Sequence, residues 1–251
     1  MYKASVLAAE KHGFFGSHGG VSGGKYASLN TNLSSQDSQE DILRNFAVIA
    51  EHFKLKTENM FTIRQSVSNV AIIADKPSWF DIAADGIVTD RSNLLLGIKT
   101  ADCAPVLLAD YKHGIIGAAH AGWRGAYKGI IENVVDLMLK LGAKRENICA
   151  AIGPCLQKDS FEVKDDMRQI FIDLKASNAR YFVLDTEKCL HFDLSGYVED
   201  KLMALGIKNV ENCHIDTYPV ANGYFSYRRN THLHLISKEK DYPTQYSCIR
   251  L

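Results

Sequence analysis

The chain lacks several features that mark particular classes of protein. Its five prolines are scattered, and it contains no low-complexity tract and no internal repeat, which excludes disordered linkers and repeat architectures. It has no run of Lys or Arg, and 29 basic residues balance 29 acidic ones to a formal net charge of zero. We therefore expect no nucleic-acid partner, because binding to phosphates needs a clustered positive face.

Long apolar runs and closely paired cysteines are also missing. The first twenty residues pass from a few apolar positions directly into charge and glycine, so we expect neither a signal peptide nor a membrane span and predict a cytoplasmic protein. The six dispersed cysteines form no CxxC pair and are interpreted as thiols. The 251-residue length and the 46% hydrophobic content favour one domain over residues 1–251, as a monomer or a homodimer.

Hydrophobic periodicity predicts strands in blocks, with helices between them. Helical spacing covers residues 38–53, 125–141, 164–175 and 194–205. Strand-like runs cover residues 61–63, 70–74, 86–89, 94–99, 106–110, 115–119, 148–152, 212–217, 223–227 and 247–251. Because strands and helices do not alternate regularly, the pattern indicates the α+β class.

The residues that carry chemistry concentrate in TADCAPVLLADYKHGIIGAAHAGWRG, residues 100–125. If Asp110 and Ile115 close a hairpin, Cys103 and His120 become near-diagonal neighbours, with Cα atoms roughly 7 to 8 Å apart. A thiolate and an imidazole so placed reach one metal ion or one another. Asp102 would point to the opposite face of the strand and is a structural candidate. On composition alone, an inert core role for Cys103 is the more common outcome.

A glycine-rich segment follows His120 and opens the helix predicted over residues 125–141. Gly122, Arg124 and Gly125 lie in it, and unpaired amides at a helix start favour an anion. The Arg124 guanidinium adds a forked donor that suits phosphate or carboxylate. The segment predicts an anion site beside the Cys/His pair, although Arg124 is equally suited to capping a neighbouring strand.

Several motifs in this order resemble the YfiH/laccase-domain family, which is associated with purine nucleoside phosphorylase and adenosine deaminase activity. They are TADCAPVLLAD, HAGWRGAYKG, ADGIVTD, AIGPC, YFSYRR and the early stretch FFGSHGGVSGGKYASLN, so the resemblance covers nearly the whole chain. It implies a four-layer α/β/β/α arrangement of mixed β-sheets, which agrees with the α+β class.

The resemblance also implies a zinc site with three protein ligands, of which this chain retains two. The Cys of TADC and the His of HAGWRG correspond to Cys103 and His120. The third ligand of the family is the His of a Gln-x-His motif, and here the position two residues after Gln65 is Val67. A catalytic zinc site usually has three protein ligands, so zinc affinity is expected to fall steeply. His18, His191 and His214 are weak candidates to replace the missing ligand.

One further pattern is a His-Leu-His triplet, His232 to His234, which would project both rings from one face of a strand. A single triplet is far too few ligands for a multicopper centre, so a laccase function is disfavoured. An exposed polar edge is the better interpretation of the triplet.

The first hypothesis is therefore a purine nucleoside phosphorylase that acts on a nucleoside and phosphate, with any adenosine deaminase activity weakened by the missing ligand. Asn30 in the SLN stretch and Arg228 in the SYRR stretch are candidate donors to the substrate, and structural roles are the alternative for both. The roles of Arg64 and Arg229 stay open. Two alternatives remain: a metal-free hydrolase that uses Cys103 and His120, and a non-catalytic purine binder.

Overall fold

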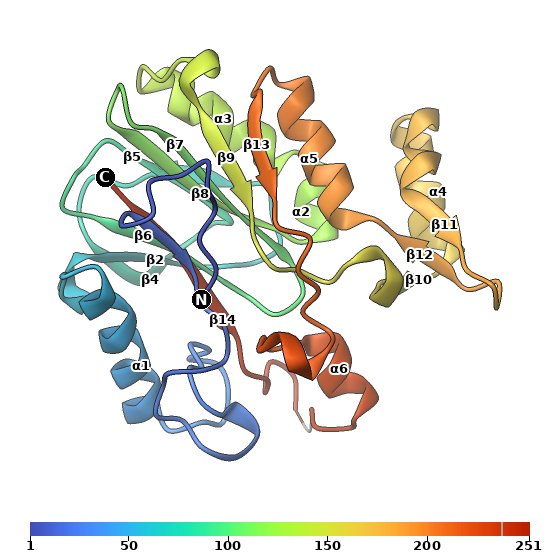
Figure 1. Cartoon of the computed structure of the whole chain (residues 1–251), viewed down its shortest axis with the longest axis horizontal. Helices are drawn as coiled ribbons and strands as arrows, with labels where there is room; N and C mark the ends of the chain where they lie inside the picture. The colour runs from blue at the N-terminus through green and yellow to red at the C-terminus, as the bar shows by residue number, and fades with distance from the viewer. Residues whose placement is uncertain (237) are drawn as a thin grey trace.

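Two β-sheets stacked face to face form the centre of the fold, and helices cover the outer face of each (Figure 1). The structure is a computed structural model and describes residues 1–236 and 238–251. The five-stranded sheet has the order β1 (His12–Phe14), β14 (Gln245–Arg250), β6 (Leu95–Thr100), β2 (Met60–Arg64) and β4 (Ser78–Ala83). Its pairings are parallel between β2 and its two neighbours and antiparallel elsewhere.

The six-stranded sheet has the order β13 (Asn209–Asn212), β9 (Cys149–Ile152), β7 (Ala104–Asp110), β8 (Ile115–Ala121), β5 (Gly86–Thr89) and β3 (Ala71–Ile73). It also mixes parallel and antiparallel pairs. A small third sheet contains β10 (Glu162–Val163), β12 (Leu190–Phe192) and β11 (Phe182–Leu184).

The helical layers lie on opposite sides of the stacked sheets (Figure 1). Helix α1 (Gln39–His52) covers the five-stranded sheet, while α3 (Ile130–Lys140) and α5 (Leu194–Ala204) cover the six-stranded sheet. Helix α4 (Asp165–Leu174) lies beside the small sheet, and two short helices are α2 (Trp123–Lys128) and α6 (Tyr227–His232). This arrangement confirms the α/β/β/α layers and the mixed sheets.

Side-chain burial explains why the layers stack. Phe14, Phe61 and Leu96 of the five-stranded sheet pack against Leu107 and Ile116 of the six-stranded sheet, and all five are 2% exposed or less. Burying an apolar side chain of this size contributes roughly 1.5 to 3 kcal/mol to folding. The inner faces of the two sheets therefore form one continuous hydrophobic core.

Three of the four predicted helices and most predicted strands are confirmed. Ser38 begins α1, where its side chain accepts a hydrogen bond from the Asp41 backbone N–H at 3.3 Å, the N-cap arrangement that satisfies a free amide. The hairpin closes in the expected register, with Asp110 opposite Ile115. β1, β4 and the three strands of the small sheet were not predicted; these are mostly very short, and β4 is irregular.

Residues 125–141 do not form the single helix that was predicted. The segment contains two helices, α2 and α3, which meet at Gly129, where φ is +94°. This left-handed conformation ends α2 at low cost because glycine has no Cβ. Apolar spacing continues across the break, so periodicity alone does not reveal it.

Two strands predicted in the C-terminal third are wrong. Strand β13 ends at Asn212, so residues 213–217 lie outside it, and residues 223–227 lead into α6. The aromatic residues Tyr224 and Phe225 are buried anchors of a loop, and Ser226 begins α6 by accepting a hydrogen bond from the Arg229 backbone N–H at 3.1 Å. His232 is the last residue of α6, so the His-Leu-His triplet does not lie on a strand.

Replacement of Gly129 by Ala tests the break between α2 and α3. The nearest atom to an added Cβ is Glu132 Oε2 at 3.5 Å, so the change introduces backbone strain without a steric clash. We expect Gly129→Ala to lower the free energy of unfolding by about 1 to 2 kcal/mol, measured by urea denaturation. Gly23→Ala is the control, because Gly23 has an ordinary φ of −108° and open space around its Cα; an equal loss in both variants would contradict the prediction.

Candidate active site

The β7–β8 hairpin brings Cys103 and His120 together. Ala104 pairs with Ala121 and Pro105 pairs with His120, so Cys103 lies just outside the ladder at the open end of the hairpin. The Cys103 side chain lies close enough to the His120 imidazole to raise its pKa. His120 is 6% exposed, whereas Cys103 is partly accessible. The structure therefore places this predicted pair in contact.

A third residue, Asp85, orients the histidine and was not predicted. His120 Nδ1 donates a hydrogen bond to Asp85 Oδ1 at 2.7 Å, and the His120 backbone N–H donates to the Asp85 carbonyl at 2.8 Å. Because Nδ1 is bound to Asp85, only the other ring nitrogen, Nε2, is free to interact with the Cys103 thiol. The arrangement is a Cys–His–Asp triad in which Asp85 fixes the imidazole.

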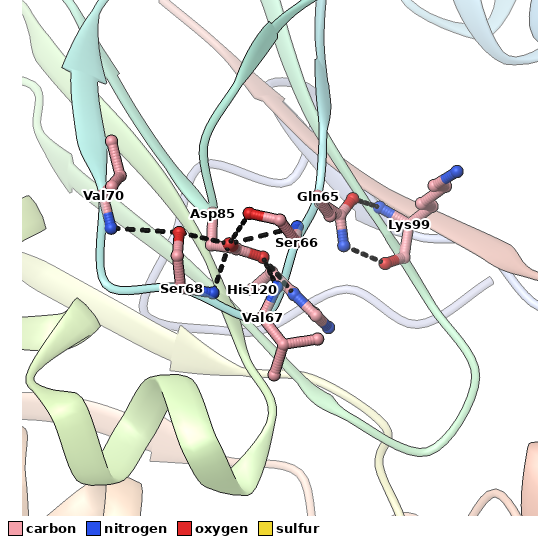
Figure 2. A network of polar contacts seen from close by, with 8 residues as sticks. All are labelled: Gln65, Ser66, Val67, Ser68, Val70, Asp85, Lys99 and His120. Carbon is pink, nitrogen blue, oxygen red and sulfur yellow. Dashed lines mark hydrogen bonds and ion pairs between the residues drawn. The ribbon is translucent and has the colours of Figure 1, made fainter.

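The loop between β2 and β3 wraps around the Asp85 carboxylate (Figure 2). The backbone N–H groups of Ser66, Val67 and Ser68 donate to it at 3.2, 3.1 and 2.6 Å. The hydroxyls of Ser66 and Ser68 donate at 3.4 and 2.6 Å. Asp85 is fully buried, and these donors replace the water that a buried carboxylate loses.

The contacts shift both pKa values in the directions expected of a buried pair. Burial alone would lower the pKa of His120, but the neighbouring Cys103 and the hydrogen bond to Asp85 raise it to about 9. Burial alone would raise the pKa of Asp85, but the hydrogen bonds from His120 and Ser68 lower it to about 2. Asp85 is therefore an ionised acceptor at neutral pH.

Val67 stands beside the pair, at the position where the resemblance implies a histidine. A Cβ built on Gly122 would lie 3.0 Å from Cys103 Sγ and 3.6 Å from Val67 Cγ1, so the thiol and the Val67 side chain border the same small space. Val67 has a φ of +58°, a left-handed conformation that is unusual for a β-branched residue. Among the residues that the structure describes, no three His, Cys, Asp or Glu side chains are arranged to hold a metal ion.

A cavity of about 190 Å³ opens on Cys103. It is lined by Ala101, Asp102, Cys103, Trp123, Leu156, Phe161, Leu194, Tyr227 and Arg228. Three aromatic rings among these residues provide flat apolar walls, and Arg228 provides a positive charge, with its guanidinium 5.6 Å from the Phe161 ring centre. Because pockets for drug-sized ligands measure roughly 300 to 1,000 Å³, the cavity encloses only part of such a ligand.

Asp102 connects the cavity to α6. Its φ of +84° turns the chain between β6 and β7, so its side chain lines the same cavity as Cys103 instead of lying on an opposite strand face. Its carboxylate accepts hydrogen bonds from the Thr217 hydroxyl and the Arg228 backbone N–H, both at 2.6 Å. Burial raises the pKa of Asp102. These contacts hold α6 in place and thereby position Arg228.

The remaining predicted residues are more dispersed. Gly122 borders Cys103, and Gly125 packs near the Ser68 carbonyl, which would lie 3.0 Å from an added Cβ. The guanidinium of Arg124 stacks on the Trp123 ring at 4.1 Å, and Arg124 is not among the cavity-lining residues. The anion site predicted there starts a helix of only six residues, and its role stays a prediction.

Asn30 is not brought to the cavity. It is fully buried, donates to Ser35 and Asp37, and accepts from the Thr244 backbone N–H at 3.1 Å. These partners give its amide a structural role in the loop that follows the SLN stretch. Arg64 ends β2 with an exposed side chain.

The Arg229 guanidinium donates to the carbonyls of Thr217, Tyr218 and Tyr224 at 2.7 to 2.8 Å and ties their loop to α6. Of the two SYRR arginines, Arg229 is therefore the structural one, whereas Arg228 lines the cavity.

The fold and the site together define a four-layer α/β/β/α protein in which a buried His–Asp pair lies next to Cys103, a residue that lines an aromatic cavity. Comparison with known sequences gives the particular family. Residues 11–235 match the family described as multi-copper polyphenol oxidoreductase laccase, and the chain belongs to that family. No helix within the described residues is both long enough and apolar enough to cross a membrane.

Curated relatives carry the names of two enzymes. A purine nucleoside phosphorylase of Rickettsia prowazekii is 38% identical over 204 residues, covering 81% of this chain and 83% of the relative. A purine nucleoside phosphorylase of Deinococcus radiodurans is 34% identical and covers 88% of this chain and 85% of the relative. An adenosine deaminase from an unknown prokaryotic organism is 34% identical over 132 residues, about half of each chain.

Solved structures share the fold over nearly the whole chain. The hypothetical protein YfiH of Bacillus licheniformis superposes with a TM-score of 0.86 at 28% identity, covering 96% of this chain and 92% of that one. A Neisseria meningitidis protein superposes with a TM-score of 0.80 at 27% identity, covering 95% and 92%.

Removal of the Asp85 carboxylate tests how much this group contributes to the stability of the fold. Asp85→Ala leaves His120 Nδ1 and three loop amides without their acceptor. We expect the free energy of unfolding to fall by about 3 kcal/mol, since each unsatisfied buried donor is costly, measured by chemical denaturation at pH 7. The matched control is Asp90→Ala, an exposed aspartate at the end of β5, which should change stability by less than about 0.5 kcal/mol. Similar losses in the two variants would refute a special role for Asp85.

Proposed function

We propose that this protein is a purine nucleoside phosphorylase whose active site is the cavity beside Cys103, His120 and Asp85. The observation that carries the proposal is that Cys103, which lies beside the oriented His120, lines a cavity with aromatic walls and one arginine. Aromatic side chains stack readily on a purine base, and an arginine is suited to a phosphate. Relatives named purine nucleoside phosphorylase over more than four-fifths of this chain support the same function.

Phosphorolysis requires few chemical groups from the protein. An oxygen of HPO₄²⁻ forms a bond to the anomeric carbon of the ribose as the bond from that carbon to the purine nitrogen breaks. The proton of the phosphate ends on the departing purine, so the products are the free base and ribose 1-phosphate. The protein must hold the anion, orient both reactants and assist the proton transfer.

The described residues can fill these roles. Arg228 is the cavity residue suited to the phosphate, and Asp102 fixes its backbone. Trp123, Phe161 and Tyr227 offer surfaces for the base. Cys103 lines the cavity next to His120, so this pair is suited to exchange protons with the substrate.

A zinc ion does not fit this donor set as a resident cofactor. Cys103 and His120 offer one sulfur and one nitrogen, while the neighbouring Val67 offers only methyl groups. Adenosine deamination, which needs an activated water, is therefore weak or absent in this protein.

A cytoplasmic location and small-molecule partners complete the proposal. All six cysteines are free thiols, as expected of a reducing compartment, and the net charge of zero offers no attraction to nucleic acid. A monomer and a homodimer are both compatible with the function.

A second candidate function is a metal-free cysteine hydrolase, and Asp85 is the observation that favours it. Cysteine nucleophiles are activated by a histidine whose ring is oriented by a third group, and Asp85 supplies that group at 2.7 Å. Phosphate dependence separates the two functions, because a hydrolase releases product with water alone.

The assay of the proposed function uses inosine and phosphate. We expect hypoxanthine and ribose 1-phosphate only when phosphate is present, and Arg228→Gln should lower kcat/KM by about 100-fold because a charge-assisted contact to the phosphate is lost. Arg168→Gln is the control, since Arg168 is an exposed residue of α4 paired with Asp165, and it should retain full activity. Chromatography of the free base measures both variants. Absence of base release from correctly folded wild-type protein would overturn the proposed function.

A further inference from the structure

The inference concerns three neighbouring side chains: the Cys103 thiol, the His120 imidazole and the Val67 isopropyl group. Cys103 and His120 converge, and the third neighbour is the isopropyl group of Val67, which shares with Cys103 the space next to Gly122. Two of the three side chains offer a lone pair. Catalytic zinc sites use three protein ligands and keep a fourth position open, so the donor set is one ligand short.

Nearby carboxylates cannot supply the missing ligand without dismantling the site. Both oxygens of Asp85 accept hydrogen bonds from the loop at residues 66–68, and Oδ1 also accepts from His120 Nδ1. The two oxygens of Asp102 accept from Thr217 and from the start of α6. Turning either carboxylate toward Cys103 would leave several buried donors unpaired, which is costly.

The backbone at Val67 shows that the loop shape does not depend on its side chain. The Val67 amide donates a hydrogen bond to Asp85 at 3.1 Å, and the φ of Val67 is +58°. The hydrogen bonds to Asp85 therefore hold a β-branched residue in a left-handed conformation that such residues rarely adopt. Histidine is found in that conformation several-fold more often than most residues. A histidine at position 67 therefore fits the existing loop.

We infer that the active site of this chain works without a resident metal ion, and that Val67 is the residue that restricts it to phosphorolysis by withholding the third metal ligand. The inference rests on the proposed function for its second half, because the restriction concerns the choice between two reactions of a purine nucleoside. Phosphorolysis uses phosphate as its own nucleophile. Deamination of adenosine instead requires a water made nucleophilic at neutral pH, for which metal coordination is the usual route.

The decisive experiment measures metal content. Wild-type protein, Val67→His and Val67→Ala are incubated with equimolar zinc, desalted and analysed by elemental mass spectrometry. We expect far less than one zinc per chain in the wild type and in Val67→Ala, and about one per chain in Val67→His, where three ligands are present. Val67→Ala is the matched control, because it changes the size of the side chain without adding a donor.

Two outcomes of the metal measurement would overturn the inference. The first is about one zinc per chain in the wild type, which needs no variant and stands even if Val67→His fails to fold. The second is a folded Val67→His protein with the same low zinc content as the wild type, because position 67 would then not complete the donor set.

Activity assays separate this inference from the proposed function. Wild-type phosphorolysis of inosine should be unchanged by a strong chelator, and adenosine without phosphate should yield no inosine. Loss of phosphorolysis with the chelator, or deamination by the wild type, would overturn the inference while leaving the phosphorylase function in place. Absence of phosphorolysis under every condition would overturn the proposed function, whereas the metal content would still decide whether the site is metal-free.

Discussion

The buried carboxylate of Asp85 is the interaction on which the site depends. It joins three segments that are distant in sequence: the loop at residues 66–68, the start of β5 and His120 on β8. A buried carboxylate without these donors would be strongly unfavourable, so the loop amides and the imidazole are held in one arrangement. Because His120 lies next to Cys103, the same constraint fixes the imidazole beside the thiol that lines the cavity.

A second carboxylate organises the opposite wall of the cavity in a similar way. Asp102 accepts hydrogen bonds from the Thr217 hydroxyl and from the Arg228 backbone N–H in the first turn of α6. A residue of the TADC motif therefore determines where Arg228 lies. The turn at Asp102 therefore has two effects. It places Cys103 next to His120, and it positions the Arg228 guanidinium. Because α6 has only six residues and isolated short helices are unstable, these contacts and the three hydrogen bonds of Arg229 are needed to hold it in place.

The sequence was most informative where structure is local. The β7–β8 hairpin could be predicted because a short polar turn joins two apolar runs, and its register then brought Cys103 close to His120. Asp85 was missed because its partner lies 35 residues away and no spacing rule connects them, although an acidic residue directly before a fully buried strand is a usable signal. The strand predicted at residues 223–227 is wrong because apolar residues can be buried without being in a strand. Tyr224 and Phe225 are buried by tertiary contacts in a loop.

In the loop at residues 66–68, the backbone determines the geometry of the site, whereas the side chain at position 67 determines whether a metal donor is present. Its conformation comes from backbone amides that donate to Asp85, and these amides are present whatever side chain stands at position 67. A change from a ligating residue to valine therefore removes a metal donor and adds local backbone strain, but it leaves the loop, the His120 orientation and the cavity in place. The fold and the arrangement of the site therefore do not depend on which side chain stands at position 67, whereas the number of metal donors beside Cys103 does.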